Sequence, residues 1–338
     1  MARRLDPFMA AMFAAIAAGM IWPAVGHVAT ALDHASAAAV ALLFFFHGAV
    51  VAPRDIARGL TQWRLHALIF GLTFGAFPIL VLPLILIPGL PEGLTTGFVY
   101  LAVLPSAVSS SIAYTAMARG NVPGAICAAA ASNVLGLLLT PVLLSVFLRV
   151  SPEAGFDLLG SVRGVVIQLL APFAAGQTAR LVAPSWIARY ESRLGQYDQA
   201  VIVLVIYVAF SHSMQADLWS TLPWRFLAFA LAACLLLLCA IFAVAILAAR
   251  GIGLSREDEI AAVFCGSKKS LASGLPLAQV LFAGAPSFGL IVLPIIIYNQ
   301  VQIIAGAVVA RRYAAKHVES RDKTEIANPE ISMNSCEN

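Results

Sequence analysis

Two polar segments interrupt the long apolar stretches of this 338-residue sequence, and they are where chemistry is most readily placed. Residues 104–111 contain Pro105 followed by serines, and residues 264–274 contain the adjacent Lys268 and Lys269. Both are poor continuous transmembrane helix, because proline lacks a main-chain N–H and because glycine and charged side chains weaken an apolar helix. We expect both helices to be interrupted near the bilayer midplane, with hydroxyls and freed main-chain groups lining a polar cavity.

The two lysines are the strongest candidates for a functional role. A lysine at the centre of a membrane span costs about 2.5–3.5 kcal/mol on insertion scales. Roughly ten or more span residues flank the pair on each side, about half of a crossing length, which favours a functional role over snorkelling to the surface. A buried ammonium can bind an anionic solute, occupy a cation site permanently, or exchange a proton. The residues themselves leave these three roles open.

Other polar residues are candidates for the same site. The full set of substrate- or ion-binding candidates is Ser109, Ser110, Ser111, Ser132, Asn133, Ser267, Lys268, Lys269, Ser270, Asn299 and Gln302. For the serines an equally good alternative is a hydrogen bond back to the carbonyl one helical turn earlier. His47 and His212 lie in apolar surroundings without ligand spacing, which favours satisfied core histidines. Asp198 opens a span near the membrane surface, where a helix cap or an interfacial position is expected.

The elements that position these residues are transmembrane helices. Hydrophobic residues make up 61% of the chain and charged residues 11%, whereas soluble domains carry roughly 25% charged residues. A crossing helix needs about 20 mostly apolar residues. Ten such stretches are predicted: 7–26, 34–52, 66–88, 95–118, 122–149, 161–183, 197–215, 223–249, 258–283 and 287–311.

The basic residues support this topology. With an inside N-terminus, 16 of the 21 Lys and Arg residues fall on the inner side, three on the outer side and two, Lys268 and Lys269, within a span. This asymmetry is typical of cytoplasmic loops. We expect a multi-pass protein of the inner (plasma) membrane with both termini in the cytoplasm. An uncleaved first helix fits better than a signal peptide cut after residues 29–31, because everything downstream also spans the membrane.

Ten spans divide at the polar gap 151–157 into two halves of five helices. An odd number of helices per half gives the halves opposite orientations, the inverted-repeat plan of many secondary transporters. The polar segments lie in the fourth helix of each half. The predicted organisation is one domain over 1–315, with repeat one at about 7–149 and repeat two at about 161–311, and a disordered cytoplasmic tail over 316–338.

Several other functions are disfavoured. The basic residues form no stripe or arm for nucleic acid, and the sequence has no P-loop and no His-Glu-x-x-His motif. No cofactor is expected, and no metal ligand set stands out. An intramembrane enzyme lacks paired carboxylates or a Ser/His dyad at one depth. A non-transporting membrane regulator or scaffold remains the alternative, and would predict a closed, dry crossing point.

The sequence resembles the bile acid:sodium symporter superfamily, most closely its SBF-like branch, the solute-carrier-ten member-seven type. The resemblance covers residues 5 to about 315. It is carried by residues 42–48 (LLFFFHG), 63–66 (WRLH), 119–121 (RGN) and 264–272 (FCGSKKSLA). It implies a core domain and a panel domain, with the fourth and ninth helices broken where they cross. It also implies alternating access of a small solute to that crossing.

The sequence departs from the sodium-coupled members. Where their ninth-helix motif carries glutamate, glutamine and asparagine, this chain has Phe264, Lys268 and Lys269, and two of their hydroxyl positions correspond to Ala125 and Ala129. Sodium needs oxygen ligands, and an ammonium beside the site would repel it. We therefore expect a secondary transporter of a small organic anion in which a lysine replaces the cation. Proton coupling or no coupling ion is favoured over Na⁺.

Overall fold

The computed structural model describes residues 7–50, 62–148, 158–182, 184–216, 223–282 and 284–327, of which 158, 161, 184–192 and 316–327 are described by their backbone alone. Every regular element in these ranges is helical, including two short π-helical turns, η2 and η3. The elements are α1 (Pro7–Ile21), α2 (Gly26–Val50), α4 (Trp63–Gly71), η2 (Leu72–Ala76), α5 (Phe77–Ile85), α6 (Glu92–Val103), α7 (Val108–Met117), α8 (Val122–Leu148), α9 (Leu158–Val165), η3 (Val166–Leu170), α10 (Ala171–Val182), α11 (Pro184–Gln215), α13 (Trp224–Gly251), α14 (Arg256–Ser267), α15 (Leu271–Leu281) and α16 (Phe288–Ala327).

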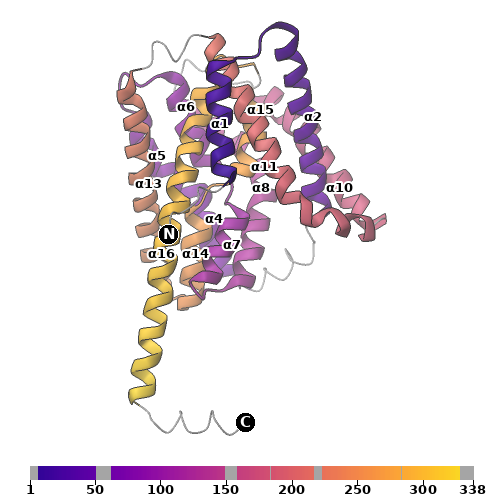
Figure 1. The fold of residues 1–338 in the computed structure, drawn as a ribbon. Helices are drawn as coiled ribbons and strands as arrows, with labels where there is room; N and C mark the ends of the chain where they lie inside the picture. Colours follow the sequence, from indigo (N-terminus) through magenta and orange to yellow (C-terminus); the bar gives the residue numbers. More distant parts are fainter. Residues whose placement is uncertain are drawn as a thin grey trace.

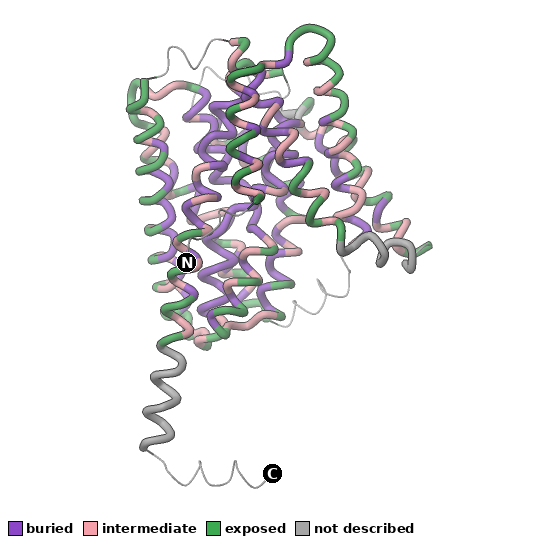
Figure 2. Tube along the Cα trace, viewed as in Figure 1, coloured by how far each residue is buried: buried purple, intermediate pink, exposed green. Residues whose placement is uncertain are grey.

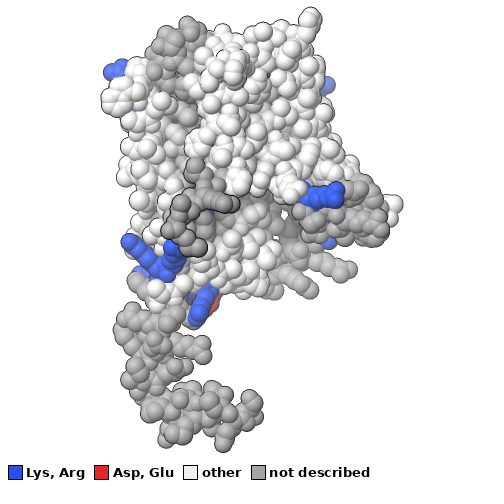
Figure 3. Space-filling model, viewed as in Figure 1, with Lys and Arg blue, Asp and Glu red and all other residues white. Residues whose placement is uncertain are grey.

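The outer surface is that of a membrane protein. Seven helices in the described part of the chain are long and apolar enough to cross a bilayer, or eight if α6 and α7 count as one bent span. Large apolar side chains face outward, such as Leu231, Leu236 and Leu247 of α13, and Figure 2 shows exposed residues along the outer side of that helix. On the face drawn in Figure 3, charged side chains leave a broad middle band free. These features confirm a helical multi-pass membrane protein, while the count of ten spans stays a prediction.

The helices form two groups that lie side by side (Figure 1). In the first group α2 packs against α10 and α11, and α1 packs against α11. Glycines allow the close approach of α2 to α10: a Cβ on Gly48 would overlap the carbonyl oxygen of Phe173, and one on Gly176 would overlap that of Phe45. Small residues are the usual means of bringing helices together in lipid, where no hydrophobic force drives them.

The second group holds both polar segments. It contains α4 to α8, α13, α14 and α16, and its most buried helix is α6, in which Gly93 to Val103 are buried with the exception of Thr95. α15 follows α14 and packs against α11 of the first group and against α9. The second polar segment therefore lies where the two helix groups meet.

Several predicted helix limits differ from the structure. The first helix ends at Ile21 instead of residue 26, and the second begins at Gly26 instead of residue 34, because the alanine-rich residues after Gly26 continue the helix in spite of Asp33 and His34. α16 extends to Ala327, so the predicted tail over 316–338 begins inside a helix whose Ala, Arg, Lys and Glu residues are good helix formers. Residues 51–61, the predicted seam at 151–157 and residues 328–338 lie outside the described residues.

Candidate functional site

The first polar segment interrupts a helix at its proline. α6 ends at Val103, α7 begins at Val108, and their axes are bent by 57°. Leu104 is extended (φ −69°, ψ 151°), as expected for a residue that precedes a proline. Room for the ring of Pro105 comes from Gly136 of α8, where a Cβ would lie 2.7 Å from it.

The second polar segment is interrupted without a proline. α14 ends at Ser267 and α15 begins at Leu271. Lys268 (φ −93°, ψ 142°) and Ser270 (φ −79°, ψ 112°) are extended. Ser270 caps α15, since its Oγ accepts a hydrogen bond from the N–H of Ser273 at 3.1 Å. The second break is therefore followed directly by a capped helix N-terminus, that of α15.

The two breaks lie against each other. The N–H of Ser270 donates to the carbonyl of Pro105 at 2.9 Å. Ser106 Oγ donates to the carbonyl of Cys265 at 2.6 Å, and Ser111 Oγ donates to that of Phe264 at 3.0 Å. Main-chain groups that a continuous helix would have paired internally are thus satisfied across the crossing, as burial in a membrane protein requires.

Gln302 of α16 fixes the main chain of the second break. Its Oε1 accepts from the N–H of Lys269 at 2.9 Å, and its Nε2 donates to the carbonyl of the same residue at 2.9 Å. Its Nε2 also contacts Asn299 Oδ1 at 3.1 Å. The side chain of Gln302 is fully buried. Its amide therefore provides both the acceptor for the N–H of Lys269 and the donor for its carbonyl, in a place that water does not reach.

The ammonium group of Lys269 occupies a cage of carbonyl oxygens. Its Nζ donates to the carbonyls of Thr73 at 2.8 Å, Ala102 at 2.7 Å and Leu104 at 2.9 Å, and lies 4.3 Å from the ring centre of Phe77. Three acceptors match the three donors of a charged ammonium, whereas a neutral amine would turn its lone pair toward an oxygen. The aromatic face adds a favourable contact for a cation.

Lys268 points the other way. Successive side chains of an extended segment project to opposite sides, which separates the two ammonium groups. Lys268 Nζ lies 3.9 Å from the ring centre of Tyr114 and 3.4 Å from the carbonyl of Gln302. Gly306 leaves space for it, because a Cβ there would lie 3.0 Å from Nζ and 2.9 Å from the Tyr114 ring. Both lysine side chains are fully buried.

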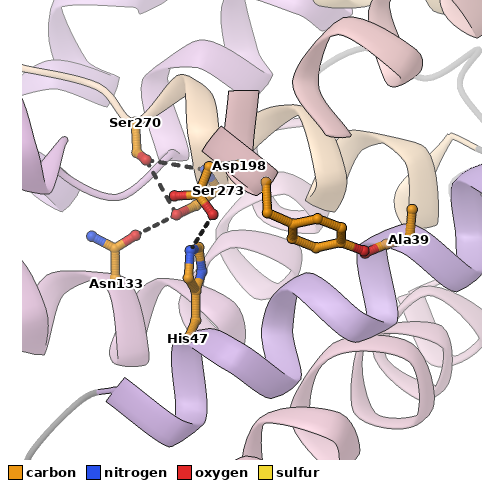
Figure 4. A network of polar contacts seen from close by, with 7 residues as sticks. Ala39, His47, Asn133, Asp198, Ser270 and Ser273 are labelled. Atoms are coloured by element: carbon orange, nitrogen blue, oxygen red, sulfur yellow. Dashed lines mark hydrogen bonds and ion pairs between the residues drawn. The ribbon is translucent and has the colours of Figure 1, made fainter. Parts of the chain in front are cut away.

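A cavity of about 430 Å³ lies beside the crossing, between the two helix groups. Its polar wall on the side of the second group is made of hydroxyl and amide side chains: Ser109, Ser110, Asn133, Ser270, Ser273 and Asn299. Asn133 Oδ1 accepts from Ser273 Oγ at 2.5 Å, and its Nδ2 donates to the carbonyl of Ser106 at 2.8 Å. Figure 4 shows Asn133, Ser273 and Ser270 turned toward one another.

The structure divides the residues predicted for the site into two sets. Five of them line the cavity, namely Ser109, Ser110, Asn133, Ser270 and Asn299. Six are buried behind that wall, namely Ser111, Ser132, Ser267, Lys268, Lys269 and Gln302. Ser267 forms the alternative bond expected of a membrane serine, because its Oγ donates to the carbonyl of Val263 four residues earlier at 2.5 Å.

His47 and Asp198 were not among the predicted site residues, yet both line the cavity. His47 Nε2 lies 3.1 Å from Asp198 Oδ1, and each side chain is 23% exposed. Asp198 lies well inside α11, which begins at Pro184 and not near residue 197, so it does not cap the helix. Their separation by 151 residues hid the pair, although the sequence placed His47 in one of its recognisable motifs.

A multi-pass helical membrane protein with a polar cavity beside its most buried polar segments fits the class of membrane transporters. The chain belongs to the SBF-like CPA transporter family, whose family model matches residues 6–315. The resemblance found in the sequence is therefore confirmed. The protein is a transporter and not an enzyme.

Its relatives agree with this membership. The chain is 41% identical to a Pseudomonas aeruginosa protein named "Uncharacterized protein PA2026" and 39% identical to an Escherichia coli protein named "Putative symporter YfeH", in each case over 92% of this chain and 93% of the relative. It is 28% identical to the sodium/bile acid cotransporter 7 of Rattus norvegicus over 97% of this chain and 98% of the relative.

Proposed function

We propose that this protein is a secondary transporter of a small organic anion, and that the ammonium of Lys269 stands where a coupling cation would bind. The observation that carries the proposal is the carbonyl cage around Lys269 Nζ, which lies directly behind the hydroxyl and amide wall of the cavity. A fixed positive charge there repels Na⁺ and attracts an anion. H⁺ or no coupling ion is favoured over Na⁺.

The cavity suits such a solute. Its wall combines hydroxyl and amide groups, which donate hydrogen bonds to carboxylate oxygens, with apolar side chains such as Phe44, Leu137 and Ile202. A volume of about 430 Å³ is within the range of sites for small organic molecules. A mixed wall of this kind fits an anion that also has an apolar part.

An inverted repeat accounts for the placement of the two breaks. A shift of 165 residues maps Asp33 onto Asp198 and His47 onto His212 (198 minus 33 and 212 minus 47), and both pairs join the same two helices. The same shift maps the break at 104–107 onto 269–272, next to the break at 268–270. It also maps Arg119 onto Gly284, and both have positive φ (59° and 73°). These matches support two five-helix repeats, at about 7–149 and 161–311, inside a transporter domain over 1–315.

Alternating access follows from this arrangement. We propose that α1, α2, α10 and α11 form the panel and that the helices around the crossing form the core, which moves against it. The cavity between them reaches Val50 at the end of α2, and Ser109 in its wall is exposed. We propose that both termini lie in the cytoplasm, which places the end of α2 on the cytoplasmic side of the membrane. The cavity then opens toward the cytoplasm, so the structure is in the inward-facing state.

Uptake into liposomes tests the proposal. Purified protein is reconstituted and screened with labelled organic anions under an imposed Na⁺ gradient, an imposed H⁺ gradient, or none. Uptake that is driven by H⁺ or is independent of gradients is expected. Clear Na⁺ dependence would contradict the replacement of the cation by Lys269, and the absence of uptake for every anion would favour a non-transporting regulator or scaffold.

Thiol labelling separates a transporter from a scaffold at single residues. Ser110→Cys is expected to react with a membrane-impermeant thiol reagent at least about tenfold faster than Ser267→Cys, because Ser110 lines the cavity whereas Ser267 is fully buried. A transported anion is expected to slow the reaction at position 110. The background is the same chain with two cysteines replaced by serine: Cys239, the exposed thiol among the described cysteines, and Cys336, which lies outside the described residues. Equal, slow labelling at both positions would indicate a dry crossing.

A further inference from the structure

Two His–Asp pairs join α2 to α11, one toward each end of these antiparallel helices. His47 Nε2 lies 3.1 Å from Asp198 Oδ1, and His212 Nε2 lies 2.9 Å from Asp33 Oδ1. Only the first pair lines the cavity of about 430 Å³, while Asp33 and His212 line a separate space of about 10 Å³. The chain thus contains two chemically matched pairs, of which one lines the cavity beside the helix breaks and the other does not.

His47 and Asp198 are the titratable residues among the described side chains that line the cavity of about 430 Å³. The other polar groups there are the serine and asparagine side chains of α7, α8, α15 and α16, which do not change charge. Figure 4 shows the pair beside the Asn133–Ser273–Ser270 network. A solute in the cavity would therefore meet one wall of fixed dipoles and one group that can take up a proton.

The other titratable side chains near the pair, Arg180, Arg193 and Tyr197, do not line the cavity. Arg180 of α10 donates to the main-chain carbonyls of Ala49 and Val50, one helical turn beyond His47. The hydroxyl of Tyr197 donates to the carbonyl of Ala39. Arg193 is exposed one turn before Tyr197 on α11. The core helices that face the pair across the cavity line it with serine, asparagine and apolar side chains in the described part of the chain.

We propose that the His47–Asp198 pair is the proton-binding site that couples H⁺ to the anion, in the same direction of movement. The inference rests on the proposed function and names its coupling group. An ionised carboxylate is an acceptor only, so His47 Nε2 carries the hydrogen that faces Asp198, and an incoming proton binds at Nδ1. The pair then changes from a net charge of −1 to zero.

This change of charge gives the coupling its direction. In the unprotonated state the pair places a negative charge on the cavity wall, which disfavours entry of an anion. In the protonated state that repulsion is absent, so anion and proton occupy the cavity together. Because the proton moves in the same direction as the anion, an acidic outside would drive accumulation of the anion inside.

The test compares Asp198→Asn with the matched variant Asp33→Asn. In liposomes, the quantity measured is the ratio of initial anion uptake with an acidic outside to uptake at equal pH. We expect a ratio of at least about five for the wild type and for Asp33→Asn, and a ratio near one for Asp198→Asn and His47→Gln. A second measurement uses detergent-solubilised protein in weak buffer, where a pH indicator reports about one proton taken up per anion bound, and none in His47→Gln, which lacks the accepting nitrogen.

The outcomes separate the inference from the proposed function. A wild-type ratio that persists in Asp198→Asn, or that is lost equally in Asp33→Asn, would overturn the proton site while transport itself stands. Proton uptake when the anion binds, without transport of the anion into liposomes, would support the proton site and contradict the proposed transport function. If Asp198→Asn does not fold, as judged by gel filtration, His47→Gln carries the comparison, because glutamine at this position keeps a hydrogen-bond donor toward Asp198.

Discussion

Replacement of Lys269 by alanine is expected to abolish anion uptake and to lower the thermal stability of the protein. The variant leaves the carbonyls of Thr73, Ala102 and Leu104 without the donor they share. Each buried group left unpaired costs about 1–3 kcal/mol, so a loss of several kcal/mol is expected before water or an ion enters. Uptake is measured in liposomes and stability by a thermal melt in detergent.

The emptied cage offers a specific rescue. Three carbonyl oxygens and water are the kind of ligands that Na⁺ accepts, so Na⁺ is expected to raise the melting temperature of Lys269→Ala relative to the same concentration of choline. The wild type should show no such difference, because its ammonium fills the cage. Rescue of stability by Na⁺ would identify the position as a cation site independently of any transport assay.

Lys268 provides the matched comparison. Its ammonium has one carbonyl contact, at 3.4 Å, and the Tyr114 ring, so Lys268→Ala should cost less stability and gain no response to Na⁺. The milder variants Lys268→Gln and Lys269→Gln address the functional claim. Unchanged uptake by both would contradict the view that a lysine replaces the coupling cation.

Gln302→Leu is expected to be the second severe variant. Leucine keeps the size of the side chain but removes both partners of the Lys269 main chain, the acceptor for its N–H and the donor for its carbonyl. Two buried main-chain groups without partners cost roughly 2–6 kcal/mol together. Thermal melts should show a large loss of stability, and liposomes should show no uptake, since the second break can no longer hold its extended shape.

Gln300 is the control on the same helix. Its Oε1 has no partner among the described residues and its Nε2 lies 3.9 Å from the sulfur of Met12. Gln300→Leu should therefore change stability by less than about 1 kcal/mol. Similar melting temperatures for the two leucine variants would show that the amide of Gln302 does not hold the break. Gln302→Glu, which keeps an acceptor but has no amide donor, should fall between them.

The candidate site was partly predictable, and the reason differs from residue to residue. Pro105 and the two lysines identified both breaks, because a proline and a pair of charges are costly in an apolar helix whatever the rest of the fold. The serines could not be separated in the same way. Ser110 lines the cavity and Ser267 bonds to its own helix, yet both are serines in a polar run of a span.

His47 and Asp198 show where pattern reasoning failed. A lone histidine in an apolar stretch is more often a satisfied core residue, and an acidic residue near a predicted helix start is more often a cap. His47 is satisfied, but by a carboxylate from a helix 151 residues away and on the wall of a cavity. No local feature of either sequence segment indicates that His47 and Asp198 are in contact.

The sequence by itself determined the helical membrane class, the family and the two places where helices break, since apolar length and the cost of proline or charge are properties of single segments. The tertiary structure alone decided which groups meet. Lys269 is held by main-chain carbonyls of Thr73, Ala102 and Leu104, and every residue has such a carbonyl, so nothing in the side-chain sequence marks these three. Their convergence depends on the helix bends and crossings that bring distant backbone together.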